Sequence, residues 1–261
     1  MSGIITLTSD WKNSDYYIGA IKARIMARFP DTKFVDITHN IESYSISQAA
    51  FIVKNAYKEF PKGSIHIIAV DSEPDKNGKI LVIQDHEQYF ILNDNGSASL
   101  IFDTEPQKVV LIETGFGFEG ASFTEYSIFS QLALFILKEG DISELGNISK
   151  EYKKTPELLP QLESDTINGE VIYIDSFGNA ITNIHIDFFN ENVADSQFEV
   201  LLNSNFYKSK KIHNGYKQVD KGEIVCLFNS IGLLEIAIRE GNASQLLSLK
   251  RESEIRVKYN L

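Results

Sequence analysis

The chain is poor in cysteine and in long apolar runs, and each shortage excludes a class of protein. Its single cysteine, Cys226, excludes an intramolecular disulfide and is typical of a reducing cytoplasm. No run approaches the roughly 20 apolar residues that cross a bilayer. The N-terminus MSGIITLTSD also lacks the basic region of a secretory signal. We therefore expect a cytoplasmic protein without a membrane partner.

Positive charge is scarce as well, with 25 lysines and arginines against 36 acidic residues and a net charge of −11. Because nucleic-acid binding needs a clustered basic face, we expect no nucleic-acid partner. The five histidines show no HxxxH or HxH spacing, so no metal site is predicted. Each histidine is expected to be structural or exposed.

The 261 residues, of which 43% are apolar, suffice for one large domain or two modest ones. Strand-like and helix-like stretches alternate over about the first 115 residues. Strands are expected at Ile4–Thr8, Phe34–Ile37 and Ile65–Val70, with helices at Tyr16–Phe29 and Ser45–Lys58. This order predicts a parallel sheet with crossover helices.

Two further strands, Leu81–Ile83 and Tyr89–Leu92, are expected to form a hairpin, and the polar stretch from Ser149 to Thr166 is interpreted as a linker. Beyond it we expect six short strands and no helix of any length, which is typical of a small antiparallel barrel or sandwich. The predicted fold is an α/β N-terminal domain with a mainly parallel sheet, residues 1–155, followed by a smaller all-β barrel domain, residues 166–261.

Acidic residues follow two of the expected parallel strands, Asp10 after the first and Asp71 after the third. Ligands of parallel sheets bind beyond the carboxyl ends of the strands. A carboxylate at Asp10 suits the paired hydroxyls of a ribose, because it accepts two strong hydrogen bonds at once. The alternative is that either acid caps the helix that follows it.

The segment DSFGNAITNI, residues 175–184, interrupts an apolar strand with several hydrogen-bonding side chains. It is either a turn that closes a hairpin or a ligand loop held on rigid strands. Two more polar loops, residues 228–232 and 240–244, lie nearby in the sequence. Their amides suit a heterocycle edge or an amino-acid headgroup, since an amide offers both donors and acceptors.

Seven segments carry a family resemblance: ITLTSD followed by YYIGAIKARI, VDITHNI, IHIIAVD, LNDNGSAS, DSFGNAITNI and FNSIGLLEIAIREGNAS. In this order they resemble the S-adenosylmethionine hydroxide adenosyltransferases, the family that also contains fluorinating and chlorinating enzymes. The resemblance implies an α/β domain followed by a β-barrel, assembled as a homotrimer with the substrate between neighbouring subunits. It also implies attack of a nucleophile on the ribose C5′ of S-adenosylmethionine, which displaces methionine.

The resemblance assigns roles to most of the polar loops. It places Asp10 on the ribose hydroxyls, and it implies that adenine is read by Asn229 and by the backbone near Asn242 and Ala243. The methionine or nucleoside end is assigned to Asp175, Phe177, Asn179 and Ser230, stacking on the base to Tyr216, and further aromatic contacts to Tyr44 and Phe123.

The residues that activate water in the family are only partly present. Asp71 matches the family's acid, but the position of the family's arginine falls on Gly78. The family's His-Gly-Arg-Asp segment is replaced by Thr-Glu-Tyr-Ser at residues 124–127. Two of the three water-activating residues are therefore replaced.

A carboxylate pair can substitute for the missing residues. Asp71 and Glu125 together would raise the pKa of one partner, which then acts as the base, while Lys79 or Tyr126 orients the water. The alternative is that Glu125 caps the helix that begins near Ser127.

The sequence thus predicts hydrolysis of S-adenosylmethionine to adenosine and methionine, with no cofactor besides this substrate. A protein that binds the nucleoside without turning it over is the alternative, because the family's arginine and histidine are absent. A purely structural trimer is disfavoured by the many polar residues of the pocket type. A halogenase is disfavoured too, since a glutamate at position 125 would repel a halide.

Overall fold

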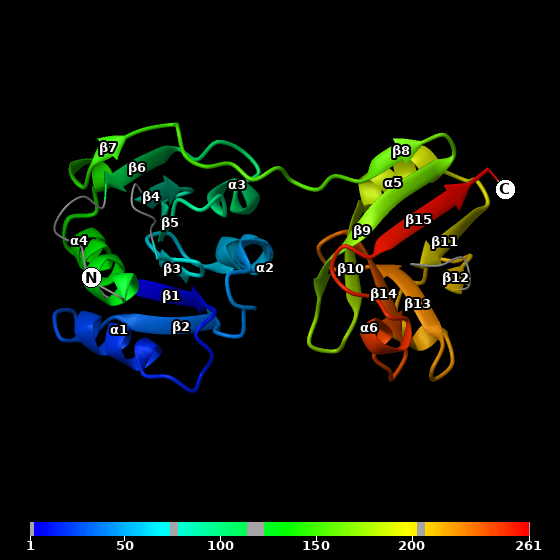
Figure 1. Cartoon of the computed structure of the whole chain (residues 1–261), viewed down its shortest axis with the longest axis horizontal. Coiled ribbons are helices and arrows are strands. Elements are labelled where there is room, and N and C mark those ends of the chain that lie inside the picture. Colours follow the sequence, from blue (N-terminus) through cyan, green and yellow to red (C-terminus); the bar gives the residue numbers. More distant parts are fainter. Residues whose placement is uncertain (1–2, 74–77, 114–122, 203–206, 261) are drawn as a thin grey trace. The chain divides into compact units, whose positions relative to one another are not determined.

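The computed structural model describes residues 3–73, 78–113, 123–202 and 207–260. They form two compact units, Met1–Pro156 and Glu157–Leu261 (Figure 1). Each unit has its own sheet and its own buried apolar core.

The first unit is built on a seven-stranded sheet with the order β2-β1-β3-β5-β4-β6-β7. Its strands are β1 (Ile4–Ser9), β2 (Lys33–Thr38), β3 (Ile65–Ala69), β4 (Lys79–Asp85), β5 (Gln88–Asn93), β6 (Lys108–Glu113) and β7 (Asn147–Ile148). Strands β2, β1, β3 and β5 run parallel, whereas β5, β4, β6 and β7 pair antiparallel. The sheet is therefore mixed, and not mainly parallel as expected.

The change of direction is caused by the hairpin of β4 and β5, which was predicted from the sequence. Only His86 and Glu87 connect the two strands, and their φ angles are +48° and +60°. Two successive positive φ angles are typical of the tight turn that matches the twist of a hairpin. Strand β5 then pairs with β3 on its other side, so one strand joins the parallel half to the antiparallel half.

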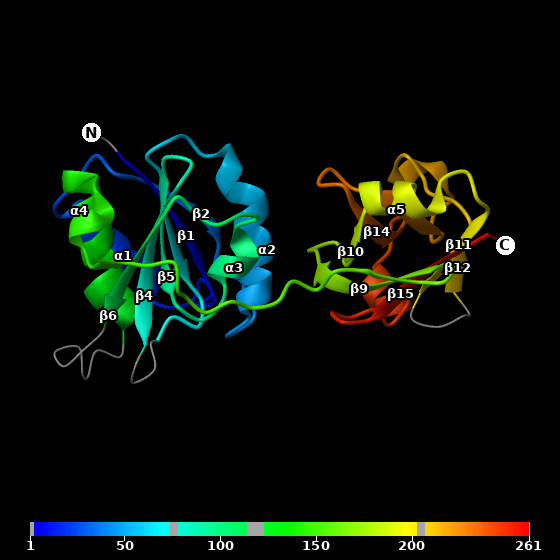
Figure 2. The ribbon, with the colours of Figure 1, turned by 90° about the horizontal axis from the view of Figure 1, so that it is seen from above.

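Helices cover both faces of this sheet. They are α1 (Tyr17–Met26), α2 (Ile46–Ala56), α3 (Ala98–Ile101) and α4 (Ser130–Glu139), with short helical turns η1 (Tyr57–Glu59), η2 (Glu125–Phe129) and η3 (Ile142–Glu144). One core contains residues of α1 and α4, and the other contains residues of α2 and α3 (Figure 2). Every residue of β3 is buried, as expected for a strand covered on both faces.

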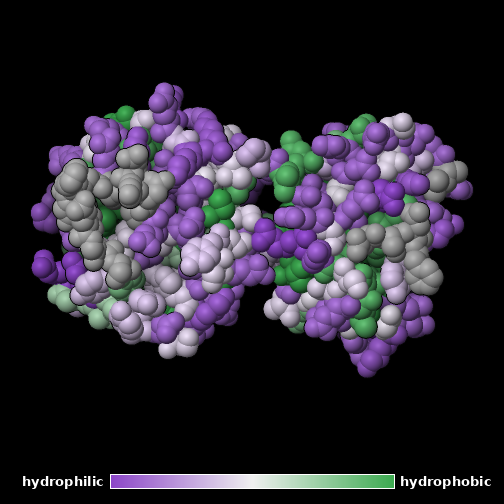
Figure 3. Space-filling model, viewed as in Figure 1, coloured by the Kyte–Doolittle hydropathy of each residue, from purple (hydrophilic) through white to green (hydrophobic). Residues whose placement is uncertain are grey.

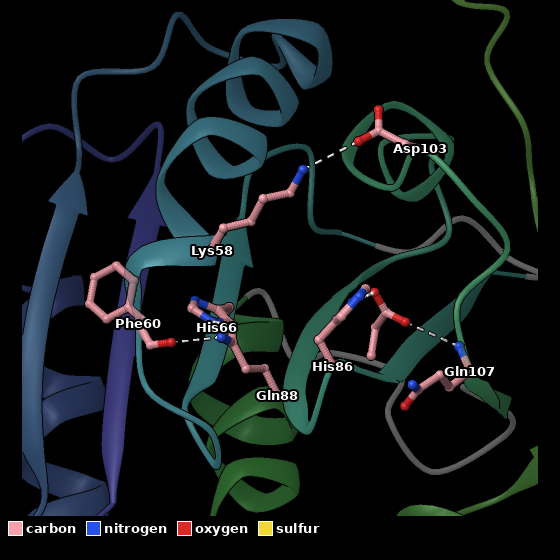
Figure 4. Close-up of polar contacts among 8 residues, drawn as sticks. Lys58, Phe60, His66, His86, Gln88, Asp103 and Gln107 are labelled. Atoms are coloured by element: carbon pink, nitrogen blue, oxygen red, sulfur yellow. Dashed lines mark hydrogen bonds and ion pairs between the residues drawn. The ribbon is translucent and has the colours of Figure 1, made fainter. Parts of the chain in front are cut away.

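A polar relay crosses the core at His66 of β3, which is 1% exposed (Figure 4). Gln88 donates to the carbonyl of Phe60 at 2.8 Å, so its oxygen accepts from His66 Nε2 at 2.8 Å. Nδ1 of the same ring then accepts from the Thr6 hydroxyl at 2.8 Å. Burial lowers the pKa of His66 to about 4, so this histidine is a neutral part of the core.

The second unit is an antiparallel, nearly barrel-shaped sheet with the order β12-β11-β15-β9-β10-β14-β13, and β8 pairs with β9. Its strands are β8 (Gln161–Glu163), β9 (Thr166–Ile174), β10 (Ala180–His185), β11 (Phe198–Leu202), β12 (Tyr207–Ser209), β13 (Ile224–Phe228), β14 (Leu233–Ile238) and β15 (Glu254–Tyr259). His213 forms a bridge to Leu227 of β13, so the chain after β12 returns to the opposite edge strand.

The expectation of no helix in this unit was wrong. Helix α5 (Ile186–Val193) has eight residues, and α6 (Ala243–Leu246) and η4 (Tyr216–Gln218) are short. In α5, Phe189 and Val193 are buried four residues apart, and the His185 ring accepts from the backbone N–H of Asp187 at 3.2 Å. Burial of this stripe stabilises a short segment whose asparagines and phenylalanines give only a weak helical signal.

The surface is mainly hydrophilic in the view of Figure 3, in line with the charged composition. None of the helices in the described part of the chain is long and apolar enough to cross a bilayer. Cys226 is fully buried in β13, and burial raises the pKa of its thiol to about 12. Cys226 is therefore a thiol of the buried core.

Candidate functional site

The carboxyl end of β1 lies at a switch point of the first sheet. Strand β2 pairs with one side of β1 and β3 pairs with the other, so the chain leaves β1 in one direction and returns on the opposite side. Ligands of open α/β sheets bind in the crevice outside such a point. Asp10 directly follows β1, and Asp71 lies two residues beyond the last residue of β3. Both predicted acids therefore lie at this edge of the sheet.

Glu125 lies against the same edge. It begins η2, which leads into α4, and its side chain is 5% exposed. The Ser72 hydroxyl donates a hydrogen bond to its carboxyl group. Glu125 therefore contacts the loop after β3. The residue before it, Thr124, occupies the N-cap position of η2 and makes no side-chain capping bond.

The charge state of Glu125 follows from this position. Burial raises its pKa to about 7. The neighbouring charges that add to the increase are those of Asp10 and Glu73, and not that of Asp71 as predicted. A hydrogen bond with its own backbone N–H lowers the pKa in part. The group can therefore gain or lose a proton near neutral pH, as a general base must.

Left-handed backbone conformations gather at the three strand ends. Lys12 after β1, Tyr44 after β2 and Asp71 after β3 have φ angles of +63°, +66° and +48°. Asp71 is held there by the side chains of Asn93 and Asn95, which donate to its carbonyl at 3.0 and 3.1 Å. Such conformations cost free energy for residues with a Cβ, and they concentrate at functional sites.

Asp10 is fixed from both sides. Its Oδ2 accepts from the backbone N–H of Tyr44 at 3.0 Å, whereas the Tyr44 side chain is 75% exposed. The preceding Ser9 hydroxyl lies 2.7 Å from His39 Nδ1, and His39 Nε2 lies 3.3 Å from Asp36. Because Ser9 is fully buried, this Ser-His-Asp arrangement anchors the loop and offers no exposed nucleophile.

An aromatic cluster surrounds Phe123 next to these acids. Its ring centroid lies 5.6 Å from Trp11, 4.9 Å from Tyr17 and 5.6 Å from the stacked ring of Tyr126. The Arg24 guanidinium lies over Tyr126 at 4.5 Å. Phe123 thus connects the segment before Glu125 to the segment after Asp10.

In the second unit, the segment DSFGN is the turn between β9 and β10. Asp175 Oδ1 accepts from the backbone N–H groups of Phe177 and Asn179 at 2.9 and 2.8 Å, and its Oδ2 accepts from the Asn179 amide at 3.0 Å. The Phe177 side chain is 75% exposed. The acid therefore builds the turn, and the turn presents the phenylalanine.

A second polar loop contacts this turn at Gly178. Its carbonyl accepts from the backbone N–H of Ser244 at 2.8 Å, and Asn242 Oδ1 caps α6 through Gln245 at 2.9 Å. A Cβ at position 178 would lie 2.2 Å from Asn242 Cγ, so only glycine fits there. Ala243, the first residue of α6, is fully buried in the core.

A third cluster joins Tyr216 and Asn229 through Glu235 of β14. The Tyr216 hydroxyl donates to Glu235 at 2.6 Å, and the Asn229 amide nitrogen donates to it at 3.4 Å. Burial raises the pKa of Tyr216, and Glu235 and Asp175 raise it further, so the phenol stays protonated. Ser230 is exposed in the turn that follows Asn229.

The structure brings most predicted site residues together within each unit. In the first unit, Asp10 lies near Glu125 and accepts from the Tyr44 backbone, Phe123 packs on Trp11, and Asp71 lies at the same sheet edge after β3. In the second unit, Asp175, Phe177 and Asn179 form a turn that contacts the loop of Asn242 and Ala243. Tyr216 and Asn229 meet at Glu235, and Ser230 follows Asn229. Both predicted water-orienting residues are described: Lys79 is the first residue of β4, and Tyr126 stacks on Phe123. Of the loop that precedes Gly78, residues 74–77 lie outside the described residues. Among those described, no group of three or more His, Cys, Asp or Glu side chains could hold a metal ion.

Sequence reasoning missed Ser72, Trp11 and Glu235. Only Glu235 had a usable signal, because it is the one charged residue within the strand LLEIAI. An acid at a buried strand position needs partners, and this requirement points to a polar cluster.

Comparison with known proteins shows the family of the chain. Residues 5–146 match the model of the SAM hydroxide adenosyltransferase N-terminal domain, and residues 169–256 match that of the C-terminal domain. The chain therefore belongs to the S-adenosylmethionine (SAM) hydroxide adenosyltransferase family.

Individual relatives extend over nearly the whole chain. An (R)-S-adenosyl-L-methionine hydrolase of Methanocaldococcus jannaschii is 28% identical, over 98% of this chain and 96% of the relative. One from Thermus thermophilus is 26% identical, over 95% of this chain and 97% of the relative. An uncharacterized conserved protein from Thermotoga maritima, whose structure is solved, is 28% identical with a TM-score of 0.84, over 99% of this chain and 100% of the other.

Proposed function

We propose that this protein hydrolyses S-adenosylmethionine to adenosine and methionine, with Glu125 as the general base. Water attacks the ribose C5′, the C5′–S bond breaks, and its electron pair goes to sulfur, which leaves as the neutral thioether of methionine. The proton of the attacking water passes to Glu125. The observation that carries the proposal is this buried carboxyl, whose pKa is about 7, beside Asp10 at the sheet's switch point.

The physical argument concerns the nucleophile. Free water has a pKa of ~15.7, and in the absence of a metal it needs a positioned base. A base is most effective when its pKa lies near the working pH, and Glu125 meets this condition. Asp71, which follows β3 at the same sheet edge, would hold or orient the water, and Asp10 would hold the ribose hydroxyls.

Charge also favours this substrate class. Asp10, Glu73 and Glu125 give the edge of the first unit a negative potential. A sulfonium is attracted to such a site, whereas a halide is repelled. The substrate would bind between subunits of a homotrimer, to which each chain brings the acids of its first unit and the polar loops of its second.

A second candidate function is binding of S-adenosylmethionine or adenosine without turnover. It is favoured by Gly78 and by residues 124–127, which stand where the family's arginine and His-Gly-Arg-Asp segment are expected. If this is the function, the polar loops bind the ligand, and Glu125 serves only to accept the hydrogen bond from Ser72.

The test is to incubate the protein with S-adenosylmethionine and follow adenosine by chromatography. Glu125→Gln keeps the shape and the acceptor for Ser72 but removes the base, so kcat should fall by about 10²–10⁴-fold with little change in binding. Glu139→Gln, an exposed acid paired with Lys138, is the matched control. Tight adenosine binding without turnover by the wild type would establish the binding protein instead.

A further inference from the structure

Glu235 is a buried acid that the proposed reaction does not use. Its side chain is 3% exposed in β14, between Leu234 and Ile236, which are fully buried. A charged group in such surroundings is unfavourable unless every hydrogen-bonding position is satisfied. Its two oxygens accept from Tyr216 and Asn229, two residues that sequence reasoning assigned to the adenine.

These contacts determine which groups of Tyr216 remain for a ligand. The phenol has one proton, and it is donated to Glu235 at 2.6 Å. The side chain is nevertheless 46% exposed, so a ring tethered at its hydroxyl still presents apolar surface to solvent. A stacking surface that is fixed before binding loses less rotamer freedom when a ligand arrives.

The same carboxylate determines the direction of the Asn229 amide. Asn229 Oδ1 accepts from the backbone N–H groups of Ile231 and Leu233 at 3.2 and 3.1 Å, so both of its lone pairs are used. Its nitrogen has two hydrogens, and one of them points to Glu235. One N–H remains, so the amide can donate to a ligand but cannot accept from it.

We propose that Glu235 is a positioning residue for purine recognition, which holds the Tyr216 ring and the Asn229 amide so that they offer a fixed stacking face and a single N–H donor. That donor is complementary to a ring nitrogen of adenine. The inference rests on the proposed function, because the ligand must be an adenine nucleoside. Asp175 lies close enough to influence Tyr216 electrostatically, so the DSFGN turn borders the same cluster.

The first experiment compares wild type, Glu235→Gln, Tyr216→Phe and the double variant. A glutamine offers one oxygen for two donors, so the KM for S-adenosylmethionine and the Kd for adenosine should rise about tenfold, with kcat within about twofold. The rise in Kd for the double variant should be smaller than the product of the rises for the two single variants. Both changes act on the same contact, the hydrogen bond from Tyr216 to Glu235. Glu199→Gln is the control, because Glu199 is a carboxylate that, among the described residues, pairs only with Lys208 and Lys210. Its KM and Kd should match those of the wild type.

Analogues of adenosine that each lack one ring nitrogen test the donor directly. One of these deaza analogues should bind about tenfold more weakly than adenosine to the wild type. Asn229→Asp keeps the oxygen that accepts from the turn but removes the N–H, so it should bind that analogue and adenosine equally. Equal binding of all analogues by the wild type would overturn the assignment of the donor.

The outcomes separate this inference from the proposed function. If the wild type neither binds adenosine nor forms it, the proposed function fails. If the wild type is active and Glu235→Gln changes only thermal unfolding, with KM and Kd intact, Glu235 is structural and the inference alone fails. If Glu235→Gln does not fold, Tyr216→Phe, which leaves the carboxyl in place, still has to raise the Kd for adenosine.

Discussion

An acid that is buried in order to act as a base carries a cost in the folded state. Glu125 has a pKa of about 7, against 4.5 for an unperturbed glutamate. Between these values the folded chain binds more protons than the unfolded chain, so stability falls as the pH rises through this window. Above pH 7 the full free-energy difference that corresponds to the shift in pKa opposes folding.

Glu125→Gln should therefore stabilise the protein at neutral pH while it removes activity. At pH 7.5 we expect the free energy of unfolding in urea to rise by about 3 kcal/mol, and at pH 4 we expect almost no change. Glu139→Gln should show neither effect. An equal gain at both pH values would mean that the ionisation of Glu125 is not the cause.

The acids in apolar surroundings were visible in the sequence, but their partners were not. Glu125 precedes the apolar start of a helix, and Glu235 stands inside an apolar strand. The partner of Glu125, Ser72, is 53 residues away in the chain. Contacts of this kind depend on how the strands are ordered, so single-sequence patterns indicate that a partner is needed without naming it.

Among the elements, the β9–β10 turn depends on one glycine. Gly178 has a φ of +81°, and a Cβ there would meet Asn242. Gly222 in the same unit has a φ of +84°, and a Cβ there would meet nothing within 4 Å. The two positions thus separate backbone strain from steric exclusion.

Gly222→Ala should cost about 1 kcal/mol of stability, from the left-handed conformation alone. Gly178→Ala should cost about 3 kcal/mol, because the methyl group must also displace Asn242 and with it the cap of α6. Urea unfolding of both variants measures the difference. Similar losses would show that Asn242 moves aside at no cost.

The elements that were predicted correctly are those with local signals. The β4–β5 hairpin has clear strands around a two-residue turn, and β1, β2 and β3 lie within one residue of the bounds that were expected. Helix α5 was missed because its sequence, IDFFNENV, is short and rich in residues of low helix propensity, with two asparagines, two phenylalanines and an aspartate. Its stability comes from the burial of Phe189 and Val193, which is a tertiary effect.

At the scale of the whole molecule, two buried groups give opposite pH dependences. The pKa of His66 is lowered from 6.5 to about 4, so in this window the unfolded chain binds more protons and stability rises with pH. Glu125 acts in the other direction over nearly the same range. From pH 5 to 7.5 each contributes about 2 kcal/mol, so the two nearly cancel in the wild type.

Removal of one titrating group should reveal the pH dependence of stability that the other group causes. Glu125→Gln should gain about 2 kcal/mol of stability from pH 5 to 7.5, as His66 loses its proton in the unfolded state. The double variant with His66→Gln should have a flat profile over this range. Urea unfolding at four pH values checks both, and a flat profile for Glu125→Gln alone would contradict the assignment to His66.

The overall organisation was predictable to a limited degree. The alternation of strands and helices indicated the parallel half of the first sheet, and the short strands indicated an antiparallel second unit. The insertion of β5 between β3 and β4 was not predictable, because a hairpin can add to a sheet through either strand. The mixed sheet follows from that choice.

The place of β1 between β2 and β3 has a consequence for synthesis of the chain. Its partner β2 follows within about 30 residues, but its other partner, β3, ends only at Ala69. Until the ribosome has released that segment, one edge of β1 keeps unpaired backbone groups beside the apolar side chains of Ile5 and Leu7. The nascent chain is therefore open to pairing with other strands during this interval, and early chaperone binding would protect it.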